Sequence, residues 1–139
     1  MDSEHTSIFS AVNQFYARQT QSIDEGNIGV YSGTFASRAI IVNAANGSRL
    51  TGHNVIHATA LENFLKRREA RLQSRHFMLT QSTRNLGDGM IGVLSHVLIL
   101  QTPHNGLASI LASVICDDII TKLPGDEFTI QFRTISPFG

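Results

Sequence analysis

The sequence predicts an α+β domain in which helices come first and long strands follow. Near the start, apolar side chains recur at spacings of three and four residues, at Ile8, Val12, Phe15 and Tyr16, as on a helix with one buried face. After Ser74 the pattern changes to long apolar runs separated by glycine-containing turns, which is typical of strands. Helices followed by such strands pack on one face of a largely antiparallel sheet, and this is the α+β arrangement.

Each expected element has a local signal. Asn46-Gly47 is a strong hairpin signal, because both residue types tolerate the positive φ angles of a tight turn. A turn near Ser22 separates the first two helices, and glycines weaken the second of them, which begins at Asp24 or Glu25. The expected helices span about 8–22, 24–31 and 53–72. The expected strands span about 38–43, 48–51, 75–84, 90–102, 107–122 and 127–135.

Length and composition restrict the class of protein. A chain of 139 residues with 42% hydrophobic residues and no net charge suits one domain, over residues 1–139, with a substantial core. Neutral charge argues against nucleic acid, because phosphate binding requires a basic surplus. The polar start at residues 1–5 is unlike a signal peptide, and the apolar run 90–100 is too short to span a bilayer. We therefore expect a soluble, cytoplasmic protein with no membrane partner.

Cofactor and metal signals are weak. The single Cys116 excludes an internal disulfide and a cysteine-rich zinc site, and a buried, inert thiol is expected. His53 and His57 have the i, i+4 spacing of two metal ligands on a helix, but the zinc-protease glutamate and a third ligand are missing. The sequence therefore predicts no metal and no cofactor. The basic run Lys66-Arg67-Arg68 is interpreted as a solvated helix face.

The order of the expected elements, together with several local segments, resembles the NTF2-like superfamily. The segments are Leu50-Thr51-Gly52-His53, Arg75-His76, 116–120 and 128–133. Within the superfamily the chain looks most like the SnoaL-like branch, which is also similar to scytalone dehydratase and to the small subunits of ring-hydroxylating dioxygenases. The resemblance implies a cone, in which a curved mixed or antiparallel sheet wraps around three N-terminal helices and encloses an apolar pocket.

The same resemblance implies candidate catalytic residues. In scytalone dehydratase an aspartate after the first helix hydrogen-bonds a strand histidine, and Asp24 matches that aspartate. A second histidine follows the third helix, and His76 matches it, while His96 lies on the strand that carries the first. Two tyrosines that hold a water in that enzyme correspond to Ile23 and Asn43. The tyrosine-and-water machinery is therefore absent, and dehydration of the same kind is not implied.

Strand alternation offers an independent argument for these positions. It places His76 on one face with Ser74 and Met78, and it predicts that His96 and Asp118 face the same cavity from neighbouring strands. Three such groups around an apolar cavity suit general acid–base catalysis. Structural alternatives stay open: a role as a hydrogen-bonded core residue for each histidine, as a helix cap for Asp24, and as an ion-pair partner of Arg133 for Asp118.

The leading hypothesis is a cofactor-independent tailoring enzyme, an isomerase, cyclase or dehydratase. It would act on a hydrophobic molecule of polyketide or terpenoid type, with His76, Asp24 and His96 as catalytic residues. The candidate substrate-binding residues are Tyr16, Tyr31, Phe35, Asn43, Phe64, Met78 and Asp118. The alternatives are a non-catalytic binding protein and a structural subunit of a larger oxygenase. A homodimer is expected through the open sheet face, with outward residues Val93, Val97, Ile99, Leu111 and Ile115.

Overall fold

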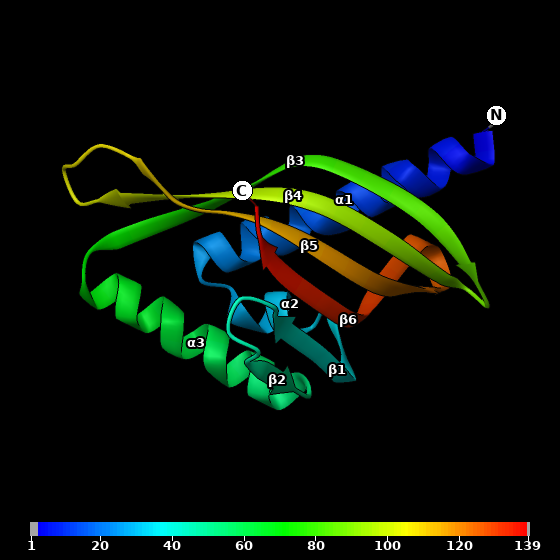
Figure 1. Cartoon of the computed structure of the whole chain (residues 1–139), viewed down its shortest axis with the longest axis horizontal. Helices are drawn as coiled ribbons and strands as arrows, with labels where there is room; N and C mark the ends of the chain where they lie inside the picture. The colour runs from blue at the N-terminus through cyan, green and yellow to red at the C-terminus, as the bar shows by residue number, and fades with distance from the viewer. Residues whose placement is uncertain (1–2, 139) are drawn as a thin grey trace.

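Three helices and one curved six-stranded sheet make up the described part of the chain in this computed structural model. The backbone is described for residues 3–138, and the side chains for residues 8–79 and 81–138. The helices are α1 (Ser3–Glu25), α2 (Ile28–Ser32) and α3 (His53–Glu69). The strands are β1 (Phe35–Asn43), β2 (Arg49–Thr51), β3 (Leu72–Gly87), β4 (Met90–Pro103), β5 (Ser109–Leu123) and β6 (Glu127–Pro137). Figure 1 shows the long strands β3, β4 and β5 arching over the helices.

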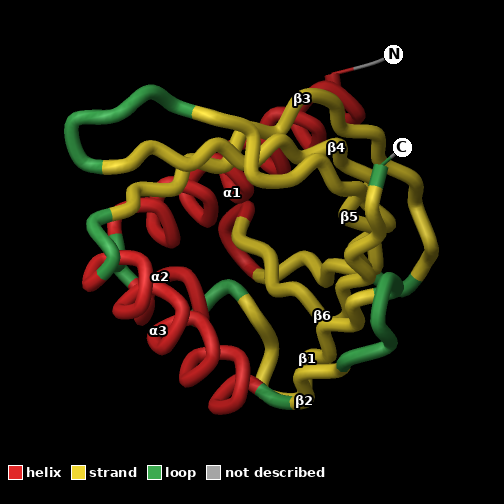
Figure 2. The backbone as a smooth tube through the Cα atoms, turned by 60° about the vertical axis from the view of Figure 1, so that its left-hand side comes forward, coloured by secondary structure: helices red, strands yellow, loops and turns green. Residues whose placement is uncertain are grey.

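The sheet is mixed, with the strand order β2-β1-β6-β5-β4-β3. Only β1 and β6 pair in parallel among the described strands, and the other neighbours are antiparallel. Register shifts interrupt the ladders in β3 near Met78, between β4 and β5 near Leu100, and between β5 and β6 near Ile120. Because such bulges bend and twist a sheet, they let it wrap around the helices, as Figure 2 shows. The α+β class and the curved mixed sheet predicted from the sequence are confirmed.

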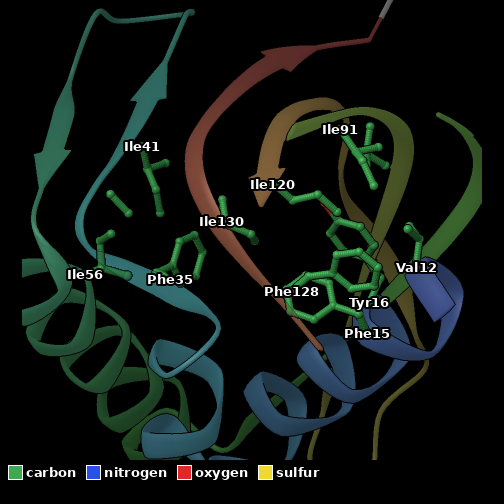
Figure 3. Close-up of a cluster of buried hydrophobic side chains, with 12 residues drawn as sticks. Val12, Phe15, Tyr16, Phe35, Ile41, Ile56, Ile91, Ile120, Phe128 and Ile130 are labelled. Carbon is green, nitrogen blue, oxygen red and sulfur yellow. The ribbon is translucent and has the colours of Figure 1, made fainter. Parts of the chain in front are cut away.

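The core fills the space between the helices and the concave face of the sheet. Helix α1 buries Val12, Phe15 and Tyr16 at the predicted helical spacing, and the Phe15 ring meets Phe128 of β6 edge to face at 5.7 Å. Figure 3 shows this group continuing through Ile130 to the residues beside α3. None of the described helices combines the length and the apolar character that crossing a bilayer requires.

Helix α1 is longer than the sequence indicates. No turn interrupts it near Ser22, and Asp24 lies in its last turn rather than at the start of the second helix. Gly26 ends the helix with a φ of 83°, a conformation that residues with a Cβ rarely adopt. The Phe64 ring also packs on this glycine, so that a Cβ there would lie 2.2 Å from Cζ. Asn27 then caps α2, with its side chain accepting a hydrogen bond from the Val30 N–H.

The face assigned to β4 is the opposite of the predicted one. Val93, Ser95 and Val97 are buried against the helices. His76 pairs with Ile99, so these two residues share the concave face, and His96 lies on the outer face with Leu94 and Leu98. Both alternating sets of this strand are apolar, and therefore the sequence pattern does not determine which set is buried.

Candidate functional site

Asp24 and His76 form the central pair of the candidate site. The Asp24 Oδ1 atom lies 2.6 Å from His76 Nδ1, and Asp24 Oδ2 accepts a hydrogen bond of 3.0 Å from the His76 backbone N–H. Only 6% of the Asp24 side chain is exposed, against 24% of the His76 side chain. One carboxylate therefore fixes both the ring and the backbone of the histidine.

This contact also determines what the imidazole can do. A carboxylate only accepts hydrogen bonds, so in the neutral histidine the Nδ1 atom carries the proton. The Nε2 atom is then left with a lone pair and can accept a proton from a ligand. The pair has the form of a general base held in one orientation by a buried carboxylate.

His76 borders a cavity of about 210 Å³ between α3 and the sheet. One stripe of α3, at helical spacing, forms a wall of this cavity, namely Ile56, Thr59, Ala60, Asn63 and Arg67. The other lining residues are Ile23, Tyr31, Ile41, Leu50 and Ile135. The cavity thus joins an apolar surface to a few polar groups, as small-molecule sites commonly do.

Tyr31 is one of the residues that line the cavity. Its ring packs edge to face on Phe35 at 5.4 Å between centroids. Burial raises the pKa of Tyr31, so the hydroxyl keeps its proton at neutral pH. Among the described residues, the Tyr31 hydroxyl has no hydrogen-bond partner. It is therefore a donor that remains available to a ligand.

Asp118 belongs to a second buried network. Both of its oxygens accept hydrogen bonds from Arg133, at 2.8 and 2.9 Å, and Oδ2 also accepts one of 2.6 Å from the Tyr16 hydroxyl. Arg133 also donates to Gln19, whose amide donates in turn to Thr34 at 2.6 Å. The ion pair with Arg133 that the sequence left open is thus present. Asp118 is saturated by these partners and does not line the cavity beside His76.

Burial and charge perturb several groups in this network. Burial raises the pKa of Tyr16 far above its ordinary value, and the neighbouring Asp118 charge adds to the effect. Burial acts to lower the pKa of Arg133, but Asp118 more than offsets it, so the guanidinium stays charged. Burial also raises the pKa of the Cys116 thiol, which fits the expectation of an inert cysteine. At neutral pH, Tyr16 and Cys116 are therefore uncharged and Arg133 is positively charged.

The structure resembles solved proteins, although no protein-family model matches the sequence and the search of curated proteins finds no significant match. Aln2 from a Streptomyces species matches with a TM-score of 0.84 at 24% identity, over 94% of this chain and 91% of Aln2. An NTF2-like protein with a cystatin-like fold from Novosphingobium aromaticivorans matches with a TM-score of 0.81 at 11% identity, over 97% and 84% of the two chains. The chain has the NTF2-like fold.

A third match bears on the range of roles within this fold. A protein described as the beta subunit of a putative aromatic-ring-hydroxylating dioxygenase, also from Novosphingobium aromaticivorans, has a TM-score of 0.77 at 14% identity, over 99% of this chain and 93% of that one. The predicted resemblance to the NTF2-like superfamily is thereby confirmed for the fold. Because one fold hosts many activities, the function has to be argued from the site.

The NTF2-like fold brings only some of the sequence-predicted residues to the cavity. His76 and Tyr31 line it, and Asp24 bonds to His76. His96 does not line the cavity, because it lies on the outer face of the sheet. Its ring there packs on Phe138, with 5.0 Å between the ring centroids. The prediction that His96 shares a face with His76 is therefore wrong, since a shift of one residue in strand parity moves a side chain to the other face of the sheet.

The remaining predicted residues lie around the cavity rather than in it. Tyr16 and Met78 border a separate hollow of about 390 Å³ between α1 and β3, which His76 also borders. Phe35 is buried beneath the Arg133 guanidinium, with 5.4 Å between the guanidinium carbon Cζ and the centroid of the Phe35 ring. Asn43 closes the hairpin turn by accepting a hydrogen bond from the Ala45 N–H.

Phe64 stands at the edge of the cavity region. It packs on Gly26 and borders an adjoining hollow of about 380 Å³, together with Asp24. It therefore helps to hold the end of α1, which carries Asp24, against α3.

Sequence reasoning missed the polar residues of α3 that line the cavity. Arg67 was interpreted as part of a solvated face, but it is half-buried and borders the cavity with Asn63. The helical period starting at Ile56 could have found both residues. Val55 and Leu65, on the other side of α3, are exposed.

The two α3 histidines have a different setting. The His57 Nδ1 atom lies 2.8 Å from the Ser32 hydroxyl, so this ring ties α3 to α2. His53 lies one turn away, with 6.4 Å between the ring centroids. Over the described residues, no group of three histidine, cysteine or acidic side chains is placed to hold a metal ion.

Proposed function

We propose that this protein is a cofactor-independent acid–base enzyme that isomerises, cyclises or dehydrates a hydrophobic small molecule. The main support for this proposal is the Asp24–His76 pair, with 2.6 Å between Oδ1 and Nδ1, at the wall of a mostly apolar cavity. The substrate would be of polyketide or terpenoid type, in keeping with the resemblance to SnoaL-like proteins. The finer reaction type, isomerase or lyase, is part of the same proposal.

The first step is a proton transfer to His76. Nε2 takes a proton from a carbon next to a carbonyl of the substrate, and the electron pair of the broken C–H bond moves to the carbonyl oxygen as an enolate. Asp24 accepts the hydrogen bond from Nδ1 throughout, and its charge stabilises the imidazolium that forms. Apolar walls keep bulk water away from the enolate.

Tyr31 suits the second role that this step requires. Tyr31 lines the cavity, and its protonated hydroxyl has no hydrogen-bond partner among the described residues. Such a donor stabilises the negative charge that develops on the carbonyl oxygen. In this proposal Tyr31 supplies the hydroxyl donor that the two tyrosines supply in scytalone dehydratase, where the corresponding positions of this chain are Ile23 and Asn43.

The proton on His76 then decides the outcome. Its return to a different carbon completes an isomerisation. Its transfer to a neighbouring hydroxyl, which leaves as water while the enolate electrons form a double bond, completes a dehydration. Attack of the enolate carbon on a second carbonyl, followed by protonation of the new alkoxide, forms a ring. In each case the enzyme ends in its starting protonation state.

The test is hydrogen–deuterium exchange at carbons next to a carbonyl. The protein is incubated in D₂O with 2-tetralone and a set of bicyclic β-diketones, and exchange is followed by NMR. We expect wild-type protein to accelerate exchange and His76→Asn to lose a factor of roughly 10²–10⁴. Tyr31→Phe should lose a smaller factor, because it removes a donor and leaves the base intact.

His104→Asn is the matched control, since His104 lies in the exposed turn after β4 and outside the cavity. Circular dichroism and thermal melts check that each variant folds. A folded His76→Asn protein as active as wild type contradicts the proposal. Binding of these ketones without any exchange favours the second candidate, a non-catalytic binding protein.

A subunit role is the other candidate that an observation favours. The likeness to the dioxygenase beta subunit and the apolar outer face of the sheet both suit it. For this face we propose a second copy of the same chain as the partner. Val93, Val97 and Ile99, expected there from the sequence, point inward, whereas Ile115 lies on the outer face as expected, together with Leu94 and Leu98.

Light scattering of the purified protein separates these partners. We expect a homodimer that Leu98→Glu converts to a monomer, because the glutamate would be buried without a partner in the interface. A wild-type monomer contradicts the homodimer and favours a subunit that needs a larger partner chain.

A further inference from the structure

The basic residues at the end of α3 face two different environments. Lys66 lies on the solvent side, where its ammonium group pairs with Glu62 one turn earlier at 2.9 Å. Arg67 lies on the inner side and borders the same cavity as His76. It also borders the adjoining hollow of about 380 Å³, so its side chain stands between the cavity and that hollow.

The charge of Arg67 is not neutralised within the described part of the chain. It makes no hydrogen bond or ion pair there. Asp24 also borders the adjoining hollow, but both of its oxygens are engaged by His76. Glu25 borders the hollow as well and forms no ion pair with Arg67. The Arg67 residue is partly buried, and its guanidinium keeps a permanent charge and five donors that no described residue engages, so it can bind a ligand that supplies acceptors.

Helix stability does not account for this position. A cation in the last turn of a helix interacts favourably with its macrodipole. Lys66 and Arg68 lie in the same last turn and supply that interaction from positions outside the cavity. The dipole therefore explains a basic last turn, and it leaves the inward placement of Arg67 unexplained.

We propose that Arg67 binds a carboxylate carried by the substrate, so that the natural substrate is a hydrophobic acid. This inference rests on the proposed function, in which the reacting carbon of the substrate lies beside His76. The planar guanidinium matches a carboxylate with two parallel hydrogen bonds. Asp24, Glu25 and Arg68 also border the hollow, and the two carboxylates repel a phosphate dianion more than a singly charged group.

The anchor would fix the direction in which the substrate enters. The lining stripe of α3 ends at Arg67, and Asn63 precedes it by one turn on the same wall. With its carboxylate on Arg67, the body of the molecule lies along Asn63 and Thr59 towards Ile56. His76, which borders the same cavity from β3, then meets one particular carbon, and orientation of this kind contributes strongly to rate.

The test compares 2-naphthoate with neutral 2-naphthamide, which has the same shape. Binding to the intact protein is measured by NMR titration at pH 7.5 and low salt. We expect wild-type protein to bind the acid at least roughly tenfold more tightly than the amide, as a charge-assisted pair requires. Arg67→Gln should abolish this preference and leave amide binding unchanged.

Lys66→Gln is the matched control, because it removes the same charge one residue away and should keep the preference for the acid. Equal binding of acid and amide to wild type, or an unchanged preference in Arg67→Gln, overturns the proposal. So does binding of inorganic phosphate that displaces 2-naphthoate and depends on Arg67. The assay needs no turnover, so its failure is distinct from a failure of the exchange test on His76.

Discussion

The Asp24 carboxylate binds His76 twice, once at the imidazole and once at the backbone N–H. This contact joins the last turn of α1 to the first part of β3. An acidic residue at a helix C-terminus opposes the macrodipole, and the last turn of α1 has no basic residue to compensate. A locally unfavourable residue that is held by one specific contact is a common feature of functional sites.

Asp24→Asn should lower the exchange rate by roughly 10²–10⁴ while the protein stays folded. An asparagine amide can donate to Nδ1, and the ring then takes the tautomer with its proton on Nε2, which is no longer a base. Nitrogen NMR shifts of His76 should report this change of tautomer. Glu69→Gln, an exposed change of the same charge, is the control. Asp24→Asn with normal exchange and an unchanged tautomer would contradict a positioning role.

Arg133→Met should destabilise the fold by about 3–5 kcal/mol, because it leaves the buried Asp118 charge without its partner. Urea unfolding measures the change. The double variant Asp118→Asn/Arg133→Met removes both charges and should recover a large part of the loss. If the double variant is as unstable as the sum of the two single variants, the two charges do not act as a pair.

Tyr16 should make the protein sensitive to alkaline pH. Its pKa is raised in the folded state above the ordinary 10.0, so its stabilising contribution is complete below pH 10.0. It is lost as the pH rises further, because the unfolded chain releases the proton first, at up to about 1.4 kcal/mol per pH unit. Tyr31 adds a loss of the same sign.

The measurement is urea unfolding between roughly pH 8 and 11, a range that spans the ordinary tyrosine pKa. The free energy of unfolding should fall less steeply above pH 10.0 in Tyr16→Phe than in wild type, because one titrating group has been removed. Tyr16→Phe also loses its hydrogen bond to Asp118, which should cost about 1 kcal/mol at neutral pH. Parallel curves for the two proteins in the alkaline range would show that Tyr16 does not titrate with unfolding.

Gly26→Ala should destabilise the protein by more than about 1 kcal/mol, because alanine is strained at a φ of 83° and its Cβ meets the Phe64 ring. The same change should weaken the hydrogen bonds between Asp24 and His76, because Asp24 lies in the last turn of α1, which Gly26 ends. Adding Phe64→Leu should recover the part due to the clash and not the part due to φ. A Gly26→Ala protein with wild-type stability would contradict both causes.

Local pattern was sufficient for most elements of this protein. The apolar spacing of α1, the Asn46-Gly47 hairpin and the long strands after Ser74 each depend on residues close in sequence. The match of Asp24 and His76 also came from the sequence, through resemblance to a family. The end of α1 was misplaced, because the Phe64 ring that packs on Gly26 comes from a distant helix.

The fold class, the order of the helices and strands, and the candidacy of His76 therefore follow from the amino-acid sequence without the structure. Packing in three dimensions sets which face of β4 is buried, places His96 outside and Arg67 inside, and surrounds Asp118 with Arg133 and Tyr16. The physical reason is that strand parity and helix orientation depend on register and packing between distant segments. Where both faces of an element carry compatible side chains, local pattern leaves that choice open.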